Sequence, residues 1–280
     1  MKKFLISLFM LLLAVQGTAF AAETTDEVNK MNRVDFTNNR FNELFKGEEC
    51  PIAETDKDFY ESVKRFVYGD VAQLGNLSLE QRELITIVVL TANQQPEILK
   101  KHIGGALNAG VAPEKIKSAI YQTAPYVGIP KAVIAVETAN EVFKKHKIKF
   151  PLESDRVVTE ETRFEKGLGT QVEIFGEGMK NAADKYPKSQ KYIARFLAEY
   201  CFGDFYTSSV LDLKTRELLT LCMLVSIGDT ESQIKGHIQG NLNMGNNKET
   251  ITAAITQCLP YIGFPRTLNA LKYLDQTVPE

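Results

Sequence analysis

One sequence pattern occurs twice in this chain, and this duplication constrains the fold more than any other feature. The stretch "YGDVAQLGNLSLEQRELITIVVLTANQQPE" begins at Tyr68 and returns in altered form as "FGDFYTSSVLDLKTRELLTLCMLVSIGDTE" from Phe202. Further landmarks recur in the same order. In the first copy these landmarks are Gly69–Asp70, Arg82–Leu84, His102, Gly110 and Pro125–Pro130. The corresponding residues of the second copy are Gly203–Asp204, Arg216–Leu218, His237, Gly245 and Pro260–Pro265. Chance does not produce such an ordered series, so the chain is a tandem duplication of one structural unit.

Each unit has the pattern of a helical bundle. In "LEQRELITIVVLTAN" apolar residues recur at three- and four-residue spacing, and Ser78 with Gln81 has the spacing of a capping box. Gly110 suits the end of the following helix. Prolines that suit the first turn of a helix stand at Pro96, Pro113 and Pro130. Since no long segment alternates with a period of two, the sequence predicts an all-α fold with two homologous helical units in tandem.

The chain is expected to have three parts. We assign 1–21 to a signal peptide, 22–149 to the first unit with its N-terminal helices, and 150–280 to the second unit. The segment "KFPLESDRVV" (149–158) is the predicted linker, because its proline and charges interrupt the preceding helix. Amphipathic helical stretches precede the two repeated cores, at 27–45, 56–67, 159–179 and 189–200.

The first residues predict export. Lys2 and Lys3 precede the apolar run "FLISLFMLLLAV", and Ala19 and Ala21 supply the small residues that a signal peptidase recognises. The apolar run is too short for a membrane span, so an uncleaved anchor is the less favoured alternative. The mature protein is therefore expected to be periplasmic and free of the membrane.

Charge and cysteine spacing exclude several kinds of partner. The formal net charge is −2, and the main basic block, "KKHKIK", reads as the charged end of a helix, so nucleic acid is not an expected partner. The four cysteines include no C-x-x-C, and no Cys/His cluster has zinc spacing, so no metal site is predicted. The disulfide state of Cys50, Cys201, Cys222 and Cys258 stays open.

The repeated residues resemble a known family. "RELITIVVL" followed by "KKHIGGALNAGVAPEKIKSAIYQTAPYVGIPKA" is similar to the carboxymuconolactone decarboxylase family, and the second copy, "RELLTLCML" with "KGHIQGNLNMGNNKETITAAITQCLPYIGFPR", is similar as well. The resemblance implies one of two chemistries. One is cofactor-free decarboxylation of a lactone acid, and the other is thiol redox work in support of peroxidases.

The redox branch of the family carries two cysteines that this chain lacks. Their places are taken by Gln95 and Ile98 in the first unit and by Thr230 and Gln233 in the second. A dithiol exchange needs a nucleophilic and a resolving sulfur within reach of each other, so a peroxidase-assisting role is disfavoured. A lyase resembling carboxymuconolactone decarboxylase, without a cofactor, is the favoured interpretation.

The candidate site residues form two sets, one expected to be catalytic and one expected to bind substrate. Gly105 and Ala106 lie one helical turn after His102, on the same face. These small residues either leave room for a ligand beside the imidazole or simply permit close packing of two helices. The resemblance favours a site role, in which a glutamate orients the imidazole and a cation with a hydroxyl binds the acid. The expected catalytic residues are His102, Glu83, His237 and Glu217, and the expected substrate-binding residues are Arg82, Tyr126, Arg216 and Tyr261.

The sequence predicts the family more narrowly than it predicts the reaction. The same residues suit decarboxylation, proton-transfer isomerisation or lactone opening, so the expected ligand is a small carboxylic acid or lactone. Export argues against the namesake reaction, which is normally cytoplasmic, and leaves a non-catalytic binding or assembly module as an alternative. Asn241 stands where the first copy has Ala106, so we expect the two sites to differ and the first to be the intact one. The resemblance also implies a homo-oligomer, either a trimer of two-unit chains or a smaller assembly.

Overall fold

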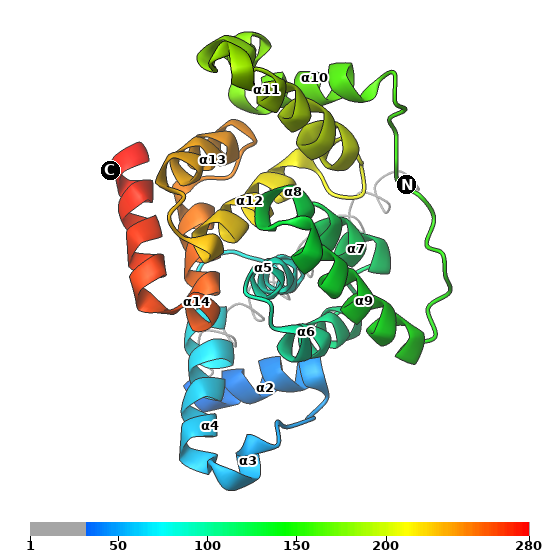
Figure 1. Ribbon diagram of the computed structural model, residues 1–280. Coiled ribbons are helices and arrows are strands. Elements are labelled where there is room, and N and C mark those ends of the chain that lie inside the picture. The colour runs from blue at the N-terminus through cyan, green and yellow to red at the C-terminus, as the bar shows by residue number, and fades with distance from the viewer. Residues whose placement is uncertain (1–31, 280) are drawn as a thin grey trace, which may run out of the picture.

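The computed structural model describes residues 32–279, and every regular element within them is a helix (Figure 1). The predicted all-α fold is thus confirmed. The signal peptide expected over 1–21 and the first residues of the stretch 27–45 lie outside the described residues. Within 32–279 no helix combines the length and apolar character that a membrane span requires.

The first unit begins with helices that lead to a repeated core. The leading elements are α2 (Arg33–Phe45), α3 (Ile52–Thr55), α4 (Lys57–Arg65), the π-helical η1 (Phe66–Asp70) and the short 3₁₀ turn η2 (Val71–Gln73). The core elements are α5 (Leu79–Ala92), α6 (Pro96–Asn108), α7 (Pro113–Tyr121), α8 (Ala124–Val127) and α9 (Ile129–Lys145). Residues 149–158, the predicted linker, contain no helix.

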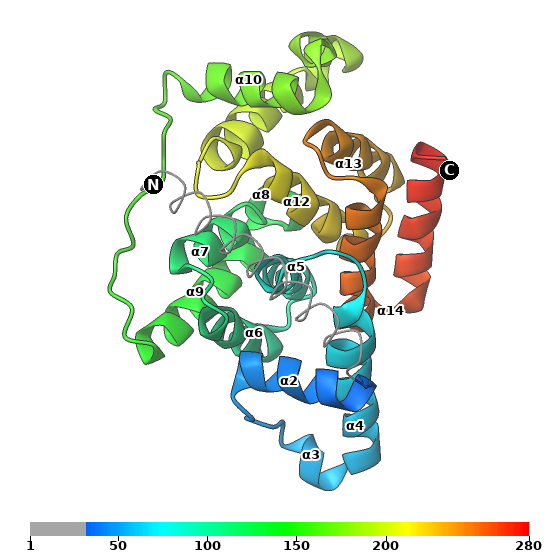
Figure 2. The ribbon, with the colours of Figure 1, turned by 180° about the vertical axis from the view of Figure 1, so that it is seen from behind.

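The second unit repeats this order. Its leading elements are α10 (Arg163–Phe175), η3 (Glu177–Lys185), η4 (Lys188–Gln190), α11 (Tyr192–Phe196) and the π-helical η5 (Leu197–Tyr206). Its core elements are α12 (Leu213–Ile227), α13 (Glu231–Asn243) and α14 (Lys248–Thr277), which continues through the region of α7, α8 and α9. Seen from behind, the two halves of α14 run side by side (Figure 2).

Local signals in the sequence set the helix boundaries. Ser78 and Gln81 form a complete capping box at the start of α5. Pro96 and Pro113 are the first residues of α6 and α7. The Tyr-x-Gly-x-Pro turn reverses the chain in both units, because Gly128 and Gly263 adopt φ values of 94° and 77° that favour glycine.

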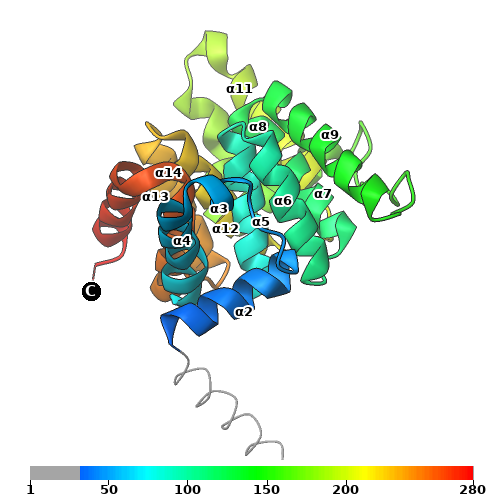
Figure 3. The ribbon, with the colours of Figure 1, turned by 90° about the horizontal axis from the view of Figure 1, so that it is seen from below.

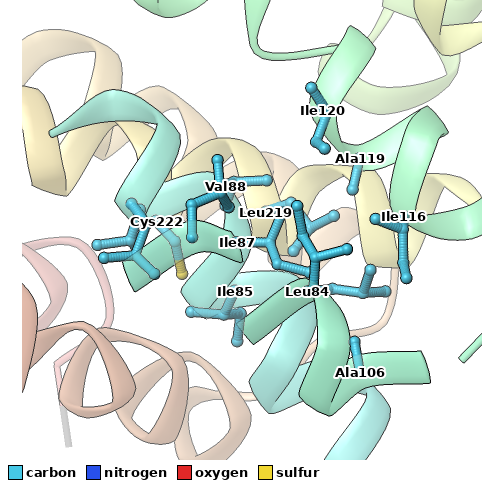
Figure 4. Close-up of a cluster of buried hydrophobic side chains, with 14 of the residues drawn as sticks. Leu84, Ile85, Ile87, Val88, Ala106, Ile116, Ala119, Ile120, Leu219 and Cys222 are labelled. Carbon is cyan, nitrogen blue, oxygen red and sulfur yellow. The ribbon is translucent and has the colours of Figure 1, made fainter. Parts of the chain in front are cut away.

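The two central helices, α5 and α12, are buried on all sides rather than on one face. Every residue of α5 from Arg82 to Ala92 is buried, and so is every residue of α12 from Arg216 to Ser226. The spacing of apolar residues predicts a single buried stripe for α5, but the second unit covers its remaining surface. Leu84 and Ile87 share one hydrophobic cluster with Leu219 and Cys222 (Figure 4). The two units therefore have a common core.

The leading helices lie at opposite ends of the molecule. In Figure 1, α2 and α4 are at one end and α10 and α11 at the other, with α5 and α12 between them. The view from below places α7 and α9 on one side of the bundle and α13 and α14 on the other (Figure 3). Arg33 binds Asp70 in the first unit as Arg163 binds Asp204 in the second, so equivalent ion pairs fasten both leading helices.

Candidate active site

The first candidate site is built on a buried glutamate–histidine pair. Glu83 lies in the first turns of α5 and His102 in the middle of α6, and each is 2% exposed. His102 Nδ1 and Glu83 Oε2 are 2.8 Å apart. A carboxylate can only accept at this contact, so it holds the imidazole proton on Nδ1 and leaves Nε2 as the reactive nitrogen.

A tyrosine of the second unit completes this site. The Tyr261 hydroxyl lies 3.4 Å from His102 Nε2, and the two rings meet edge to face with centroids 5.8 Å apart. Burial raises the pKa of Tyr261 well above its ordinary value, so this hydroxyl stays a donor at neutral pH. On the other side of the imidazole, the Phe45 ring of α2 packs at 5.5 Å. Residues of both units therefore form this site.

The second site has the equivalent glutamate–histidine contact with the units exchanged, but the Tyr126 hydroxyl contacts Tyr206 and Cys201. His237 Nδ1 lies 2.8 Å from Glu217 Oε2, and the Tyr126 ring of the first unit packs against the imidazole at 5.9 Å. Phe175 of α10 takes the place of Phe45, at 5.3 Å from the imidazole. Each tyrosine therefore lies beside the histidine of the other unit.

The predicted arginines serve as cross-links between the units. Arg82 donates from Nη1 to Gln257 Oε1 at 2.8 Å and from Nη2 to the Leu74 carbonyl at 2.6 Å. Arg216 donates in the same way to Gln122 Oε1, at 2.8 Å, and also to Ser118 Oγ, at 2.9 Å. Burial lowers the pKa of each arginine to about 10. These protein partners engage both guanidinium groups, although Arg82 still lines the cavity of the first site.

That cavity lies between α2, α5 and the second unit. Its volume is about 10 Å³, which is room for about one water molecule. Its lining includes Glu83 and Tyr261 from the site, Arg40 and Leu44 from α2, and Ala72 from η2. Arg40 is a cation of this cavity that no sequence motif singles out. It pairs with Glu43 at 2.9 Å, and its Nε is buried without a hydrogen-bond partner.

A single substitution between the repeats changes the second site. Tyr206 stands where the first unit has Ala72, and its hydroxyl lies 3.1 Å from the Tyr126 hydroxyl and also contacts Thr220 Oγ1. The phenol therefore occupies the space that Ala72 leaves open. Aligning the two repeats residue by residue would have revealed this difference.

Two further contrasts separate the sites. Thr170 occupies the position on α10 that Arg40 has on α2, so the second site lacks this cation. Asn241, which was expected to alter the second site directly, is fully buried and donates to the Glu217 and His237 carbonyls. It ties α12 to α13 rather than facing a ligand. The Oε1 atom of Glu217 is buried and has no hydrogen-bond partner.

The described residues offer few groups for metal or thiol chemistry. In 32–279 no three His, Cys, Asp or Glu side chains gather as a metal site would require. Cys201, Cys222 and Cys258 are buried, and burial raises the pKa of the Cys201 thiol to about 12. A thiol with such a high pKa is a poor nucleophile near neutral pH.

Comparisons with known proteins agree with the repeat. The model of the carboxymuconolactone decarboxylase family matches the chain twice, over residues 57–141 and 192–276. The chain is 34% identical over 93 residues to 4-carboxymuconolactone decarboxylase of Acinetobacter baylyi, a match that covers 33% of this chain and 69% of that protein. It is 30% identical over 95 residues to nitrosuccinic acid decarboxylase npaB of Metarhizium robertsii, with 32% of this chain and 66% of that protein covered. Because the family model matches more than half of its length and both repeats, the chain belongs to the carboxymuconolactone decarboxylase family.

Proposed function

We propose that the first site decarboxylates a small carboxylic acid or lactone acid without a cofactor. The observation that carries the proposal is the chain from Glu83 through His102 to the Tyr261 hydroxyl, placed beside a cavity that also holds a cation. The relatives named as decarboxylases support the reaction class. The same groups suit other proton transfers next to a carbonyl, so isomerisation or lactone opening would be the nearest alternatives.

The roles of the groups follow from their chemistry. Arg40 binds the substrate carboxylate, since its Nε has no partner and its pairing with Glu43 is a weak surface contact. As CO₂ leaves, the electron pair passes to an adjacent carbonyl, and the Tyr261 hydroxyl donates to the developing oxyanion. Protonated His102 delivers its Nε2 proton to the carbon, and Glu83 stabilises the imidazolium before that transfer. Overall, a carboxylate and one proton give CO₂ and the decarboxylated product.

Substrate binding requires the first site to open. A cavity of about 10 Å³ cannot hold an organic acid, and two of its lining residues, Arg40 and Leu44, belong to α2. We therefore propose that α2 shifts away from α5 when substrate binds. This movement also places Arg40 at the entrance, where an incoming carboxylate meets it first.

A ligand screen followed by an activity assay tests this function. Small carboxylic acids and lactones are ranked by the rise in melting temperature of the purified protein, since a ligand that binds only the folded state stabilises it. The ligands that stabilise the protein are then assayed for CO₂ release by the wild type and by Glu83→Gln. We expect CO₂ release by the wild type alone. Stabilisation without turnover of any ligand would favour the binding-module alternative, and the absence of both would contradict the proposal.

We also propose that the protein is exported and works in the periplasm. Support comes from the residues Lys2 and Lys3, the apolar run that follows and the small residues before position 22. Determination of the mature N-terminus after cell fractionation tests the proposal. A cytoplasmic protein that retains Met1 would contradict it. Export would also favour a substrate other than that of the cytoplasmic namesake reaction.

We propose that the protein forms a homo-oligomer, either a trimer of two-unit chains or a smaller assembly. Exposed apolar side chains occur at equivalent places in both units, at Ile129 and Val133 on α9 and at Phe264 and Leu268 on α14. Repeated apolar surface of this kind suits a symmetric interface. Sedimentation equilibrium measures the assembly, and Leu268→Glu is expected to weaken it. A wild-type protein that sediments as a monomer would refute the proposal.

A further inference from the structure

A buried lysine lies in a second cavity, away from the glutamate–histidine sites. Lys117 of α7 is 5% exposed, and its Nζ donates to Asn140 Oδ1 of α9 at 2.6 Å. Three aromatic rings, those of Tyr121, Phe143 and Phe150, surround the amine at centroid distances of 5.5 to 6.0 Å. In the described part of the chain no carboxylate oxygen lies within 4.0 Å of this amine. Lys117 therefore has a neutral partner where a buried ammonium would ordinarily have a counter-ion.

The second unit has neither the lysine nor the amide of this pair. At the position of Lys117 it has Thr252, and at the position of Asn140 it has Asp275. Asp275 pairs with Lys248 at 3.1 Å on the surface. The first unit thus has an amide in place of the carboxylate and a lysine directed into the protein. Burial without an ion pair lowers the pKa of Lys117 to about 8.

The cavity beside Lys117 is large enough for a small organic molecule. It has a volume of about 360 Å³ and lies between α7, α9 and the linker. Tyr121 and Phe150 give it aromatic walls, while Glu114, Glu153 and Asp155 contribute carboxylates. Those carboxylates disfavour an anionic ligand, and the aromatic walls favour a flat, neutral one.

From this geometry we propose that the cavity is a site for small neutral aldehydes, aromatic ones above all, and that Lys117 binds them as a Schiff base. The lone pair of the neutral amine attacks the carbonyl carbon, and the carbonyl oxygen takes up a proton. The carbinolamine then loses water, so amine and aldehyde give an imine and one water molecule. When the imine is protonated, its single N–H donates to Asn140 Oδ1 in place of the ammonium. This site is independent of the proposed decarboxylation.

The nucleophile is available at neutral pH. With a pKa of about 8, about a tenth of the Lys117 amine is neutral at pH 7, whereas an ordinary lysine has about one part in 3,000 in that form. Lower basicity reduces the intrinsic reactivity of each neutral amine, and the net advantage is therefore smaller than this ratio. We expect Lys117 to react about tenfold faster than a surface lysine.

Reductive trapping with benzaldehyde tests the site. The purified full-length protein is incubated at pH 7 with limiting benzaldehyde and cyanoborohydride, and peptide mass spectrometry locates the benzyl groups. Lys115 is the internal control, because it lies on the same helix but is half-exposed and pairs with Glu80 at 2.6 Å. The proposal predicts that benzylation of Lys117 exceeds that of Lys115 about tenfold. Equal labelling of the two lysines, or labelling of Lys115 first, would overturn it.

A substitution taken from the second unit sharpens the test. Asn140→Asp places a carboxylate 2.6 Å from the amine position and should raise the pKa of Lys117, so labelling at pH 7 falls about tenfold. Labelling of Lys115 should not change. The wild-type comparison needs no variant, so a misfolded Asn140→Asp protein would leave the main test intact. Unchanged labelling of Lys117 in a folded Asn140→Asp protein would contradict the proposed role of the neutral partner.

Discussion

The two glutamate–histidine pairs have the same contact distance, 2.8 Å, but different surroundings. The first pair borders a cavity with Ala72 on one side and Arg40 at its edge. At the second pair Tyr206 takes the place of Ala72, and Thr170 that of Arg40. The two repeats thus share the glutamate–histidine contact, whereas the Tyr261 hydroxyl reaches His102 and the Tyr126 hydroxyl instead contacts Tyr206. The same glutamate–histidine contact therefore occurs in two different surroundings, and the proposed function depends on the surroundings of the first.

The largest expected effect separates the two histidines. His102→Gln should lower kcat by about a thousandfold, because a general acid of this kind contributes about 10² to 10⁴ in rate. His237→Gln should leave kcat within about twofold of the wild type, since both variants remove one buried pair but only the first pair borders the cavity proposed to open for substrate. Turnover of the best ligand from the screen measures both. Equal losses in the two variants would break the proposed asymmetry.

Closing the first site should have the next largest effect. Ala72→Tyr introduces the phenol that fills the second site, and we expect kcat/KM to fall about a hundredfold while the Glu83–His102 contact stays intact. Tyr206→Ala is the matched control. It should cost about 3 kcal/mol of stability by removing a buried ring, yet leave turnover unchanged. Full activity in Ala72→Tyr would show that substrate does not use this cavity.

Removal of the cation at the edge of the cavity should have a smaller effect. Arg40→Met is expected to raise KM about tenfold with little change in kcat, because it removes a charge that binds the carboxylate but not the reacting atoms. Thr170→Met at the equivalent position of the second unit should change neither value. Steady-state kinetics at two salt concentrations measures the effect, since binding by a partly exposed charge weakens in salt. A loss confined to kcat would assign Arg40 a different role.

The sequence predicted elements well where local chemistry determines them. The capping box at Ser78 and Gln81 and the prolines at the starts of α6 and α7 are local signals, and the structure has the corresponding boundaries. The extent of burial of α5 was less predictable. Its spacing describes one face, whereas packing against the second unit buries the others.

Some features of the candidate site could likewise be predicted from the sequence, and others depended on how the two units pack. Arg82 and Glu83 are neighbours in the sequence, which predicts a common site, but adjacent residues on a helix project in different directions. Glu83 reaches His102, and Arg82 reaches Gln257 of the other unit. The exchange of Tyr126 and Tyr261 between the units depends on how the units pack, which no local spacing records. Ala72 and Tyr206 were visible in the aligned repeats, but their meaning required the position of the cavity.

The smallest expected effect concerns Lys117, which the second unit replaces with Thr252. The pKa of Lys117 is lowered to about 8 in the folded protein, below its value in the unfolded chain, so its charged form opposes folding. This destabilisation is fully present below pH 8 and disappears as the pH rises toward 10.5. Lys117→Met should therefore raise the free energy of unfolding by about 1 kcal/mol at pH 7, and by less at pH 9.5.

Urea denaturation at both pH values measures this difference between the units. Lys115→Met is the control, because Lys115 keeps its ion pair with Glu80 and should show no such gain at pH 7. A Lys117→Met protein that is less stable than the wild type at both pH values would mean that the contacts of the amine with Asn140 and the rings outweigh the cost of burying its charge. In that case Lys117 would stabilise the first unit, and the missing counter-ion would need no functional explanation. A gain at pH 7 that fades by pH 9.5 would instead show that the first unit retains a buried charge at the expense of stability, as residues kept for binding or catalysis often are.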